Sequence, residues 1–453
     1  MPDSSTAGAQ AADAPITIRD MVRMSTRLSG RERAGVVHRM MASLRETRTD
    51  GLQQREVLSP PGRTAVVRDH HGDVRTMLMF GANNYLGLAT HPVVVERVRQ
   101  AAREHGAGVG GPPLLNGYTR LHRELEERLA AYEHQEEALL YGSGYAAGLG
   151  VMSALPSRRD VAYYDAHNHA CFLDGMKLGG VASRPFPHND VAALDAALAA
   201  HPDGPGDAIV AIEGVYSMEG DAAPLDLIVP VAKRHGAVIV LDDAHGTGVA
   251  GPGGRGSAVK YGVERDIDVV VGTFSKTFAV SGGFVACSHE IATYLRFFSR
   301  SYFFSASLPP PTLAAVLAGL DILESEPERH AALMRNAAQL TAGVRALGHI
   351  VPQDDSAIVA LKVPLGMDIR AAAHAFHQRD LFVNHVEYPA VATSEQRFRL
   401  SVSADHTPAD IRELIEGVEA VWDAFAPEGL ASPGGDGAFP SEPPPLEAFE
   451  GGF

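Results

Sequence analysis

The sequence has few cysteines, no long apolar run and no excess of basic residues, and each absence excludes a class of protein. Cys171 and Cys287 are its only cysteines, and they fit neither a disulfide framework nor a metal-ligand spacing. No apolar segment approaches the roughly 20 residues that a membrane-spanning helix needs. The formal net charge of −16 disfavours a nucleic-acid partner. Residues 1–15 lack the basic and apolar regions of a signal peptide. We therefore expect a cytoplasmic protein with no membrane span and no nucleic-acid partner.

The chain does contain enough apolar sequence for a large core. Of its 453 residues, 45% are hydrophobic and 21% are charged, and this length suits two packed domains. Between about residues 92 and 320, apolar strands alternate with helical segments, which is typical of a mostly parallel sheet covered on both faces. Strands are predicted near 138–141, 160–164, 208–212, 238–241, 268–272 and 283–287. Helices are predicted near 92–105, 119–133, 191–200, 225–235 and 309–324.

The flanking regions have different patterns. Two short alternating segments, 64–68 and 74–80, predict a hairpin. Beyond residue 325, strands near 357–362 and 397–402 and helices near 368–379 and 408–424 indicate a smaller α+β domain. We therefore divide the chain into an N-terminal tail, helices and short hairpin (1–80), a large domain (81–324), a small C-terminal domain (325–425) and a flexible tail (426–453).

Lys276 is the most informative single residue. It follows the predicted strand 268–272 in a small, hydroxyl-rich turn, where an amine can form a Schiff base with an aldehyde cofactor. Asp242 follows another strand, and a carboxylate beside a pyridine nitrogen keeps that nitrogen protonated, so that the ring can accept electrons. His245 lies close enough in sequence to bind the ring hydroxyl. This order of an acid and then a lysine at strand ends is typical of pyridoxal phosphate (PLP) enzymes.

Other strand ends carry weaker signals. The glycine turn 142–147 opens a helix and can bind a phosphate, although a turn that serves only geometry explains it equally well. Thr273 can bind the same phosphate. A histidine in the loop 165–170 can stack on a flat ring, but loop histidines are more often plain surface residues. In the segment 213–221, Ser217 can donate to a ring substituent, or the segment simply caps the following helix.

Through these residues the chain resembles the α-oxoamine synthases, a family of fold-type I PLP enzymes. The resemblance covers about residues 75–420 and rests on the motifs 83–88, 121–126, 168–170, 213–221, 242–248, 254–256, 273–276 and 304–310. It implies an α/β PLP-dependent transferase fold of type I, with a mostly parallel mixed sheet in the large domain and a smaller α+β C-terminal domain.

The resemblance also implies roles for individual residues. Lys276 resembles the Schiff-base lysine that later acts as the base, and His169 resembles the histidine that stacks on the ring. The implied catalytic residues are Lys276, His169, Asp242 and His245. The implied cofactor-binding residues are Ser143, Gly144, Tyr145, His169, Ser217, Asp242, His245, Thr273, Lys276 and Ser305. Asn83 and Arg399 match the pair that binds the substrate carboxylate, and no metal is implied.

Ser305 matches a position that reaches the phosphate of a partner subunit, so the resemblance implies a homodimer with shared active sites. The implied reaction is a decarboxylative Claisen-type condensation of a small amino acid with an acyl thioester of CoA or a carrier protein. It gives an α-amino ketone, CO2 and a free thiol. The alternatives are another fold-type I PLP enzyme, an aminotransferase or an aldolase, and a non-catalytic relative, which the intact site disfavours.

Departures from the family pattern leave the substrates open. The segment 110–117, with Pro112, differs from the aminolevulinate synthase pattern and disfavours that activity. Ala390 stands where several members have threonine, and Cys171 stands where serine is usual. The amino acid, the acyl chain and the nature of the donor are therefore not predicted.

Overall fold

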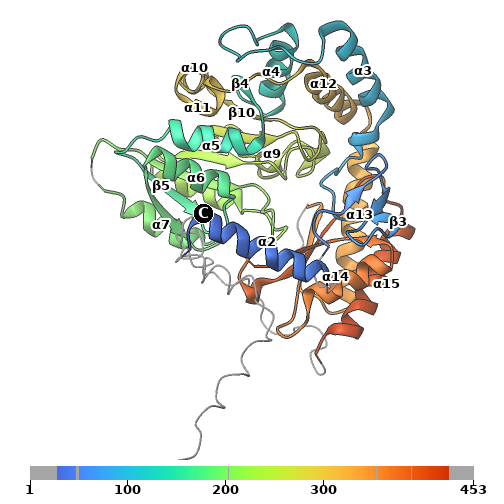
Figure 1. The fold of residues 1–453 in the computed structure, drawn as a ribbon. Coiled ribbons are helices and arrows are strands. Elements are labelled where there is room, and N and C mark those ends of the chain that lie inside the picture. Colours follow the sequence, from blue (N-terminus) through green and yellow to red (C-terminus); the bar gives the residue numbers. More distant parts are fainter. Residues whose placement is uncertain are drawn as a thin grey trace, which may run out of the picture.

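The computed structural model describes residues 28–46, 50, 52–202, 204–352, 356–388 and 390–427. The predicted tail 1–15, Pro389 and nearly all of the predicted C-terminal tail lie outside these residues. Figure 1 shows a large sheet flanked by helices, beside a smaller set of C-terminal strands and helices.

The main sheet has seven strands in the order β4-β10-β9-β8-β7-β5-β6. The strands β9, β8, β7, β5 and β6 run parallel, and β10 is antiparallel to both β9 and β4. The sheet is therefore mixed and mostly parallel, as expected. Its strands are β4 (Glu137–Tyr141), β5 (Val161–Asp165), β6 (Ala182–Phe186), β7 (Ala208–Glu213), β8 (Val238–Asp242), β9 (Val269–Thr273) and β10 (Gly283–Cys287).

Helices cover both faces of this sheet. One face packs against α5 (Gly144–Ala154), α6 (Ala170–Gly179) and α10 (His289–Phe298). The other face packs against α4 (Arg120–Tyr132), α7 (Val191–Ala199), α8 (Leu225–Arg234) and α12 (Pro310–Ser325). Every residue of β5, β7 and β9 is buried, which explains why these strands are continuous apolar runs rather than alternating ones.

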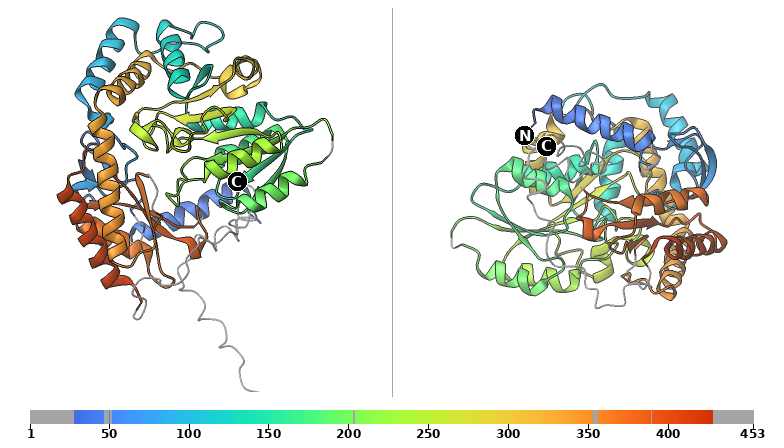
Figure 2. Two further views of the ribbon diagram at one scale, coloured as in Figure 1. Left: turned by 180° about the vertical axis from the view of Figure 1, so that it is seen from behind. Right: turned by 60° about the horizontal axis from the view of Figure 1, so that its bottom comes forward.

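Two smaller sheets lie beside the large one. The predicted hairpin is present as β2 (Thr64–Arg68) and β3 (Val74–Met79), and β3 also pairs in parallel with β12 (Leu381–Phe382). The N-terminal hairpin thus packs onto the C-terminal segment, as seen from two further directions in Figure 2. The remaining strands are β1 (Glu56–Val57) in the hairpin sheet, and β11 (Ile358–Lys362), β13 (Asn384–Val386) and β14 (Arg397–Ser401) in a three-stranded sheet.

The other helices complete these layers. They are α2 (Gly30–Glu46), η1 (Leu88–Thr90), α3 (Pro92–His105), η2 (Pro252–Gly254), α9 (Ser257–Tyr261), α11 (Arg300–Phe303), α13 (Pro327–Ala346), α14 (Ile369–Gln378), η3 (Thr393–Glu395) and α15 (Pro408–Phe425). Within the described ranges, none of the helices combines the length and the apolar character needed to cross a bilayer.

All of the predicted strands and helices between 92 and 424 are present within a few residues of the expected bounds, but several further elements were not predicted. Strand β6 forms the edge of the main sheet and is mostly exposed, so it has neither an apolar run nor a clear alternation. Its Pro185 is tolerated because an edge strand has one unpaired side. Helices α6 and α10 and the short strands β12 and β13 were also not predicted.

An aromatic cluster fixes the C-terminal elements around β14. Phe376 of α14 is fully buried and meets Phe398 of β14 at 5.0 Å between ring centroids, and Phe398 in turn meets Trp422 of α15 at 5.8 Å. The substitution Phe376→Ala is expected to lower the free energy of unfolding by about 3–5 kcal/mol, because it leaves a cavity in this cluster.

Urea denaturation followed by tryptophan fluorescence measures the change directly, since Trp422 is the only tryptophan. The matched control is Leu227→Ala on α8, whose side chain is exposed, and it should cost less than about 0.5 kcal/mol. Equal losses for the two variants would contradict the assignment of this cluster as a packed core.

Candidate active site

The carboxyl ends of the parallel strands β5, β7, β8 and β9 meet at one edge of the main sheet. These strands end in Asp165, Glu213, Asp242 and Thr273, and Glu213 lies directly opposite Asp242 in the register. Lys276 follows in the turn after β9. Crevices beyond the carboxyl ends of such strands are where open α/β sheets bind ligands, so this edge is the candidate active site.

The negative charge of Asp242 acts on the amine of Lys276. Burial lowers the pKa of Lys276, the charges of Asp242 and Glu213 partly oppose this, and the result is a pKa of about 8. The structure therefore brings together the predicted amine and the predicted carboxylate. A lysine with such a pKa is partly unprotonated near neutral pH, as a nucleophilic or basic amine must be.

Glu213 adds a second acid to this region. Burial raises the pKa of Glu213 well above its usual value, and the nearby charge of Asp242 raises it further. Its Oε1 atom has no hydrogen-bond partner among the described residues. Glu213 was not among the predicted site residues, although an acid at a strand end beside Asp242 is a signal that could have identified it.

His169 lies close to Asp242. It caps α6 by accepting a hydrogen bond at Nδ1 from the Cys171 amide (3.3 Å), which fixes the ring at the start of the helix. Polar atoms of His169, Cys171 and Asp242 all lie within 4.8 Å of one another. The thiol of Cys171 is itself 4.0 Å from Oδ2 of Asp242. The predicted ring-stacking histidine and the predicted pyridine partner therefore share one small volume.

A hydrogen-bonded chain joins the other predicted residues. The Tyr85 hydroxyl is 2.8 Å from Nδ1 of His245, and Arg399 donates from Nη1 to Oδ1 of Asn83 (3.0 Å). Arg399 also donates from Nε to the Ser217 carbonyl (2.6 Å) and from Nη2 to the Tyr85 hydroxyl (3.5 Å). The structure thus connects Asn83 and Ser217 through Arg399, and Tyr85 joins Arg399 to His245.

Tyr85 was not among the predicted site residues, although it lies inside the motif 83–88. Its side chain is fully buried, and its hydroxyl bridges His245 of the large sheet and Arg399 of β14. Burial lowers the pKa of His245 well below its usual value, and the charges of Lys276 and Arg399 add to this effect. His245 is therefore a neutral imidazole, which can donate from one nitrogen while the other faces Tyr85.

The glycine turn lies against the end of β9. A Cβ atom on Gly144 would lie 2.7 Å from Cβ of Thr273, and one on Gly283 would lie 2.5 Å from the Gly144 nitrogen. Only glycine at these two positions lets the first turn of α5 approach the sheet so closely. The Ser143 hydroxyl accepts a hydrogen bond from the Ala146 amide (3.0 Å), which caps the helix. The positive end of α5 therefore faces the strand ends, as a phosphate site requires.

Tyr145 and Ser305 lie at the margin of this arrangement. The ring of Tyr145 meets that of His169 edge-on at 6.1 Å, and its hydroxyl donates to Asp174. Ser305 follows α11, where its amide donates to the Tyr302 carbonyl at 3.5 Å. The neighbouring Ser307 amide donates to the Gly111 carbonyl (3.0 Å), so the segment 305–307 packs against the loop that differs from the aminolevulinate synthase pattern.

The residues fit PLP in three respects. An amine with a lowered pKa lies beside a buried carboxylate, an imidazole lies within 4.8 Å of that carboxylate, and a helix start formed by small residues faces the same edge. These groups match the aldehyde, the ring and the phosphate of the cofactor in turn.

Comparison with known proteins agrees with this fit. The chain matches the family described as aminotransferase class I and II over residues 75–418. It is 38% identical to 8-amino-7-oxononanoate synthase of Marinobacter nauticus, over 76% of this chain and 86% of that protein. It is 35% identical to serine palmitoyltransferase of Bacteriovorax stolpii, over 76% of this chain and 81% of that protein. The match to 4-hydroxy-2,2'-bipyrrole-5-methanol synthase PigH of a Serratia species is 36% identical, but it covers only 54% of that longer protein.

The fold is also similar to a solved structure over most of the chain. Serine palmitoyltransferase of S. paucimobilis, a variant with a bound PLP–myriocin aldimine, superposes with a TM-score of 0.79 and 33% identity, over 86% of this chain and 97% of that chain. The fold and the site therefore define a PLP-dependent enzyme of fold type I. The chain belongs to the α-oxoamine synthase family, whose members are PLP-dependent acyltransferases.

The lowered pKa of Lys276 predicts how the cofactor-free protein takes up PLP. The rate of covalent uptake should rise with pH and level off above about pH 8, because the free amine attacks the aldehyde and its pKa is about 8. If Lys276 had the usual lysine pKa of about 10.4, the rate would keep rising until the pH reached about 10.4. Stopped-flow absorbance at the wavelength of the bound cofactor follows the reaction.

Two variants serve as controls for this measurement. Lys276→Ala should abolish covalent uptake, whereas Lys233→Ala, which breaks a partly exposed ion pair with Asp268, should leave the pH profile unchanged. A wild-type rate still climbing near pH 10 would show that the amine is not held in the environment described above.

Proposed function

We propose that this protein condenses a small amino acid with an acyl thioester, releasing CO2 and a free thiol and giving an α-amino ketone. The observation that carries the proposal is the partly buried Lys276 amine, whose pKa responds to the charges of Asp242 and Glu213, together with the hydrogen bond from Arg399 to Asn83. Relatives named 8-amino-7-oxononanoate synthase and serine palmitoyltransferase support this type of reaction.

When bound, PLP supplies an electron sink for the carbanion that forms when the amino acid loses its α-proton. Lys276 holds the cofactor before the substrate arrives. Once released, its amine accepts the α-proton, a task for which a pKa near 8 is suited, because the base must be unprotonated at the working pH. Asp242 would keep the ring nitrogen protonated, and His169, which lies within 4.8 Å of that carboxylate, would hold the ring beside it.

Neutral His245 would donate to the ring hydroxyl from Nε2, because its Nδ1 is held by Tyr85. Ser217 would donate to a ring substituent, and Thr273 with the backbone of Ser143, Gly144 and Tyr145 would bind the phosphate at the start of α5. These contacts fix the plane of the ring relative to Lys276.

Arg399 and Asn83 are the proposed substrate-carboxylate site. The guanidinium is buried and already oriented by hydrogen bonds to Asn83 and the Ser217 carbonyl, so little entropy is lost when it binds a carboxylate. That same pair can hold the carboxylate until it leaves as CO2.

A homodimer with shared active sites is part of the proposal. Large apolar side chains are exposed on and beside α10 and α11, where a monomer would leave them in contact with water. These residues are Tyr294, Phe297, Phe298, Phe303 and Phe304. Ser305 follows them directly in the chain, which supports the proposal that it contacts the phosphate site of a partner subunit. Two buried, unpaired cysteines are consistent with the reducing cytoplasm as its location.

Product analysis separates this reaction from the alternatives. Purified protein given PLP, an amino acid and an acyl-CoA should release CO2 and free thiol in equal amounts, with glycine, alanine and serine tested singly. An aminotransferase would instead release an oxo acid, and an aldolase an aldehyde, each without thiol. Release of thiol without CO2 would contradict the proposal. So would the absence of both products with every amino acid tested, whether the acyl donor is a CoA ester or an acyl-carrier protein.

Arg399→Lys is expected to raise the KM for the amino acid by roughly tenfold or more, because lysine keeps the charge but cannot form the two parallel hydrogen bonds of a guanidinium. The KM for the acyl thioester should change little. Arg128→Lys is the matched control, since Arg128 forms ion pairs with Asp321 and Glu324 on the outer helices. Equal changes in the two KM values would mean that Arg399 does not bind the amino acid.

A further inference from the structure

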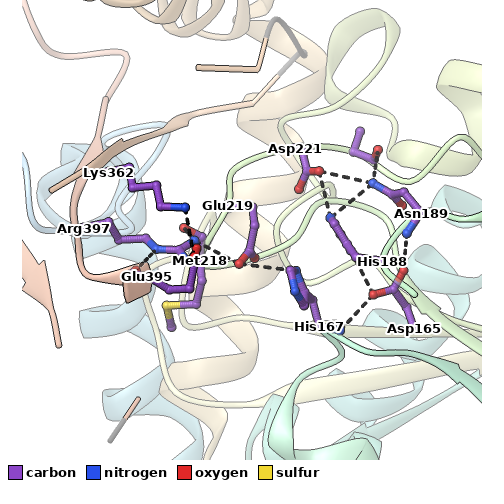
Figure 3. A network of polar contacts seen from close by, with 11 residues as sticks. Asp165, His167, His188, Asn189, Met218, Glu219, Asp221, Lys362, Glu395 and Arg397 are labelled. Atoms are coloured by element: carbon purple, nitrogen blue, oxygen red, sulfur yellow. Dashed lines mark hydrogen bonds and ion pairs between the residues drawn. The ribbon is translucent and has the colours of Figure 1, made fainter. Parts of the chain in front are cut away.

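His188, in the loop after β6, is clamped between two carboxylates. Its Nδ1 is 2.9 Å from Oδ1 of Asp165, and its Nε2 is 2.9 Å from Oδ2 of Asp221 (Figure 3). The side chain is only 5% exposed, and that of Asp165 is completely buried. Because each ring nitrogen faces a carboxylate, each must donate a proton, and the ring is therefore an imidazolium.

Asp165 and Asp221 belong to the two loops that carry His169 and Ser217. Asp165 ends β5, and it also accepts hydrogen bonds from the His167 and Asn189 amides, both at 2.8 Å. The Asn168 amide donates to the Asp165 carbonyl (3.0 Å), and His169 follows immediately. The position of Asp165 therefore determines where α6 and its capping histidine begin.

Backbone hydrogen bonds between its own residues close the loop 216–221, which contains Ser217. The Tyr216 amide donates to the Asp221 carbonyl and the Gly220 amide to the Tyr216 carbonyl, both at 2.9 Å. A shift of Asp221 is thus passed to Ser217. On its other side the loop is held by β14, because Arg397 donates to the Met218 carbonyl (3.1 Å) and to Oε1 of Glu219 (2.9 Å).

Other rings pack around His188. His167 stacks on it at 4.1 Å with an interplanar angle of 19°, and Tyr216 meets it edge-on at 4.5 Å. His167 in turn lies 3.4 Å from Oε1 of Glu219, which joins the clamp to Arg397 (Figure 3). Burial lowers the pKa of His167, so this ring is neutral and does not repel the imidazolium beneath it.

We propose that His188 is a positioning residue, whose imidazolium ties the loops 165–169 and 216–221 together so that His169 and Ser217 reach the cofactor in the correct relative position. The inference rests on the proposed roles of His169 and Ser217 as cofactor contacts. His188 itself touches neither the cofactor nor the substrate, and acts through Asp165 and Asp221.

The ionisation of His188 gives the clamp a pH dependence. Burial lowers the pKa of His188, but hydrogen bonds to Asp165 and Asp221 outweigh this and raise it to about 10. Since the pKa is raised on folding, the stabilising effect is complete below about pH 6.5 and is lost as the pH rises through about 10. The groups that face the ring are Asp165, Asp221, Tyr216, His167 and Asn189.

The test compares His188→Gln with His201→Gln, each prepared free of cofactor. His201 is a partly buried histidine that bonds the Tyr163 hydroxyl (3.1 Å) and the Gly206 carbonyl (3.2 Å), away from the site. His188→Gln should raise the Kd for PLP by roughly tenfold or more, since it leaves two carboxylates without their shared cation. It should also change the visible circular dichroism of the bound cofactor, which reports its orientation. His201→Gln should leave both unchanged.

The pH dependence gives a second readout that loss of packing alone would not move. The ratio of the variant's Kd to that of the wild type should fall towards one as the pH rises through about 10. A wild-type Kd and dichroism spectrum in His188→Gln would overturn the inference, and so would a ratio that does not change with pH.

Three further variants keep the outcomes distinct. If His188→Gln does not fold, Asp221→Asn decides, because it removes one charge and keeps the shape; an unchanged Kd there overturns the inference. His169→Ala and Ser217→Ala test the proposed site. Normal PLP binding by both would refute that site, whereas weakened binding by both with normal binding by His188→Gln would refute only the role of His188.

Discussion

The electrostatic interaction of the partly buried Lys276 amine with two buried acids, Asp242 and Glu213, is the interaction on which the rest of this structure depends. An isolated lysine is costly to bury, and so are Asp242 and Glu213, but together they offset part of one another's cost. Burial still dominates for Lys276, so its pKa falls to about 8, which makes the amine reactive near neutral pH. The parallel register of β7 with β8 sets this arrangement by placing Glu213 opposite Asp242.

The C-terminal sheet completes the site. Arg399 lies on β14, and reaches across to the Ser217 carbonyl and to Asn83, which precedes the main sheet in sequence. Arg397, two residues earlier on the same strand, holds Glu219. One strand of the small sheet thus fixes both Arg399, the proposed substrate residue, and the loop that carries Ser217, and the core behind β14 supports them. Arg397 and Arg399 of a single strand therefore both hold the backbone of residues 217–219.

Much of the fold was predictable from sequence because the buried parallel strands are continuous apolar runs with chemically useful residues directly after them. Lys276, Asp242 and His245 could be named for this reason, whereas His169 was named from the family resemblance, and the structure brings these residues together. Strand β6 could not be predicted because an exposed edge strand has no apolar pattern. Tyr85 and His188 were not identified because their roles depend on contacts between residues far apart in the sequence, whereas Glu213 was overlooked although its place at a strand end is visible in the sequence. His188, for example, meets Asp165 and Asp221 only after three loops come together.

The most direct test of the central claim is to identify the residue that carries the cofactor. The PLP-loaded protein would be reduced with borohydride, digested, and its peptides analysed by mass spectrometry. The account predicts a pyridoxyl group on the peptide that contains Lys276, and on that lysine alone. A modification on another lysine, or a bound cofactor that leaves no covalent label, would contradict it.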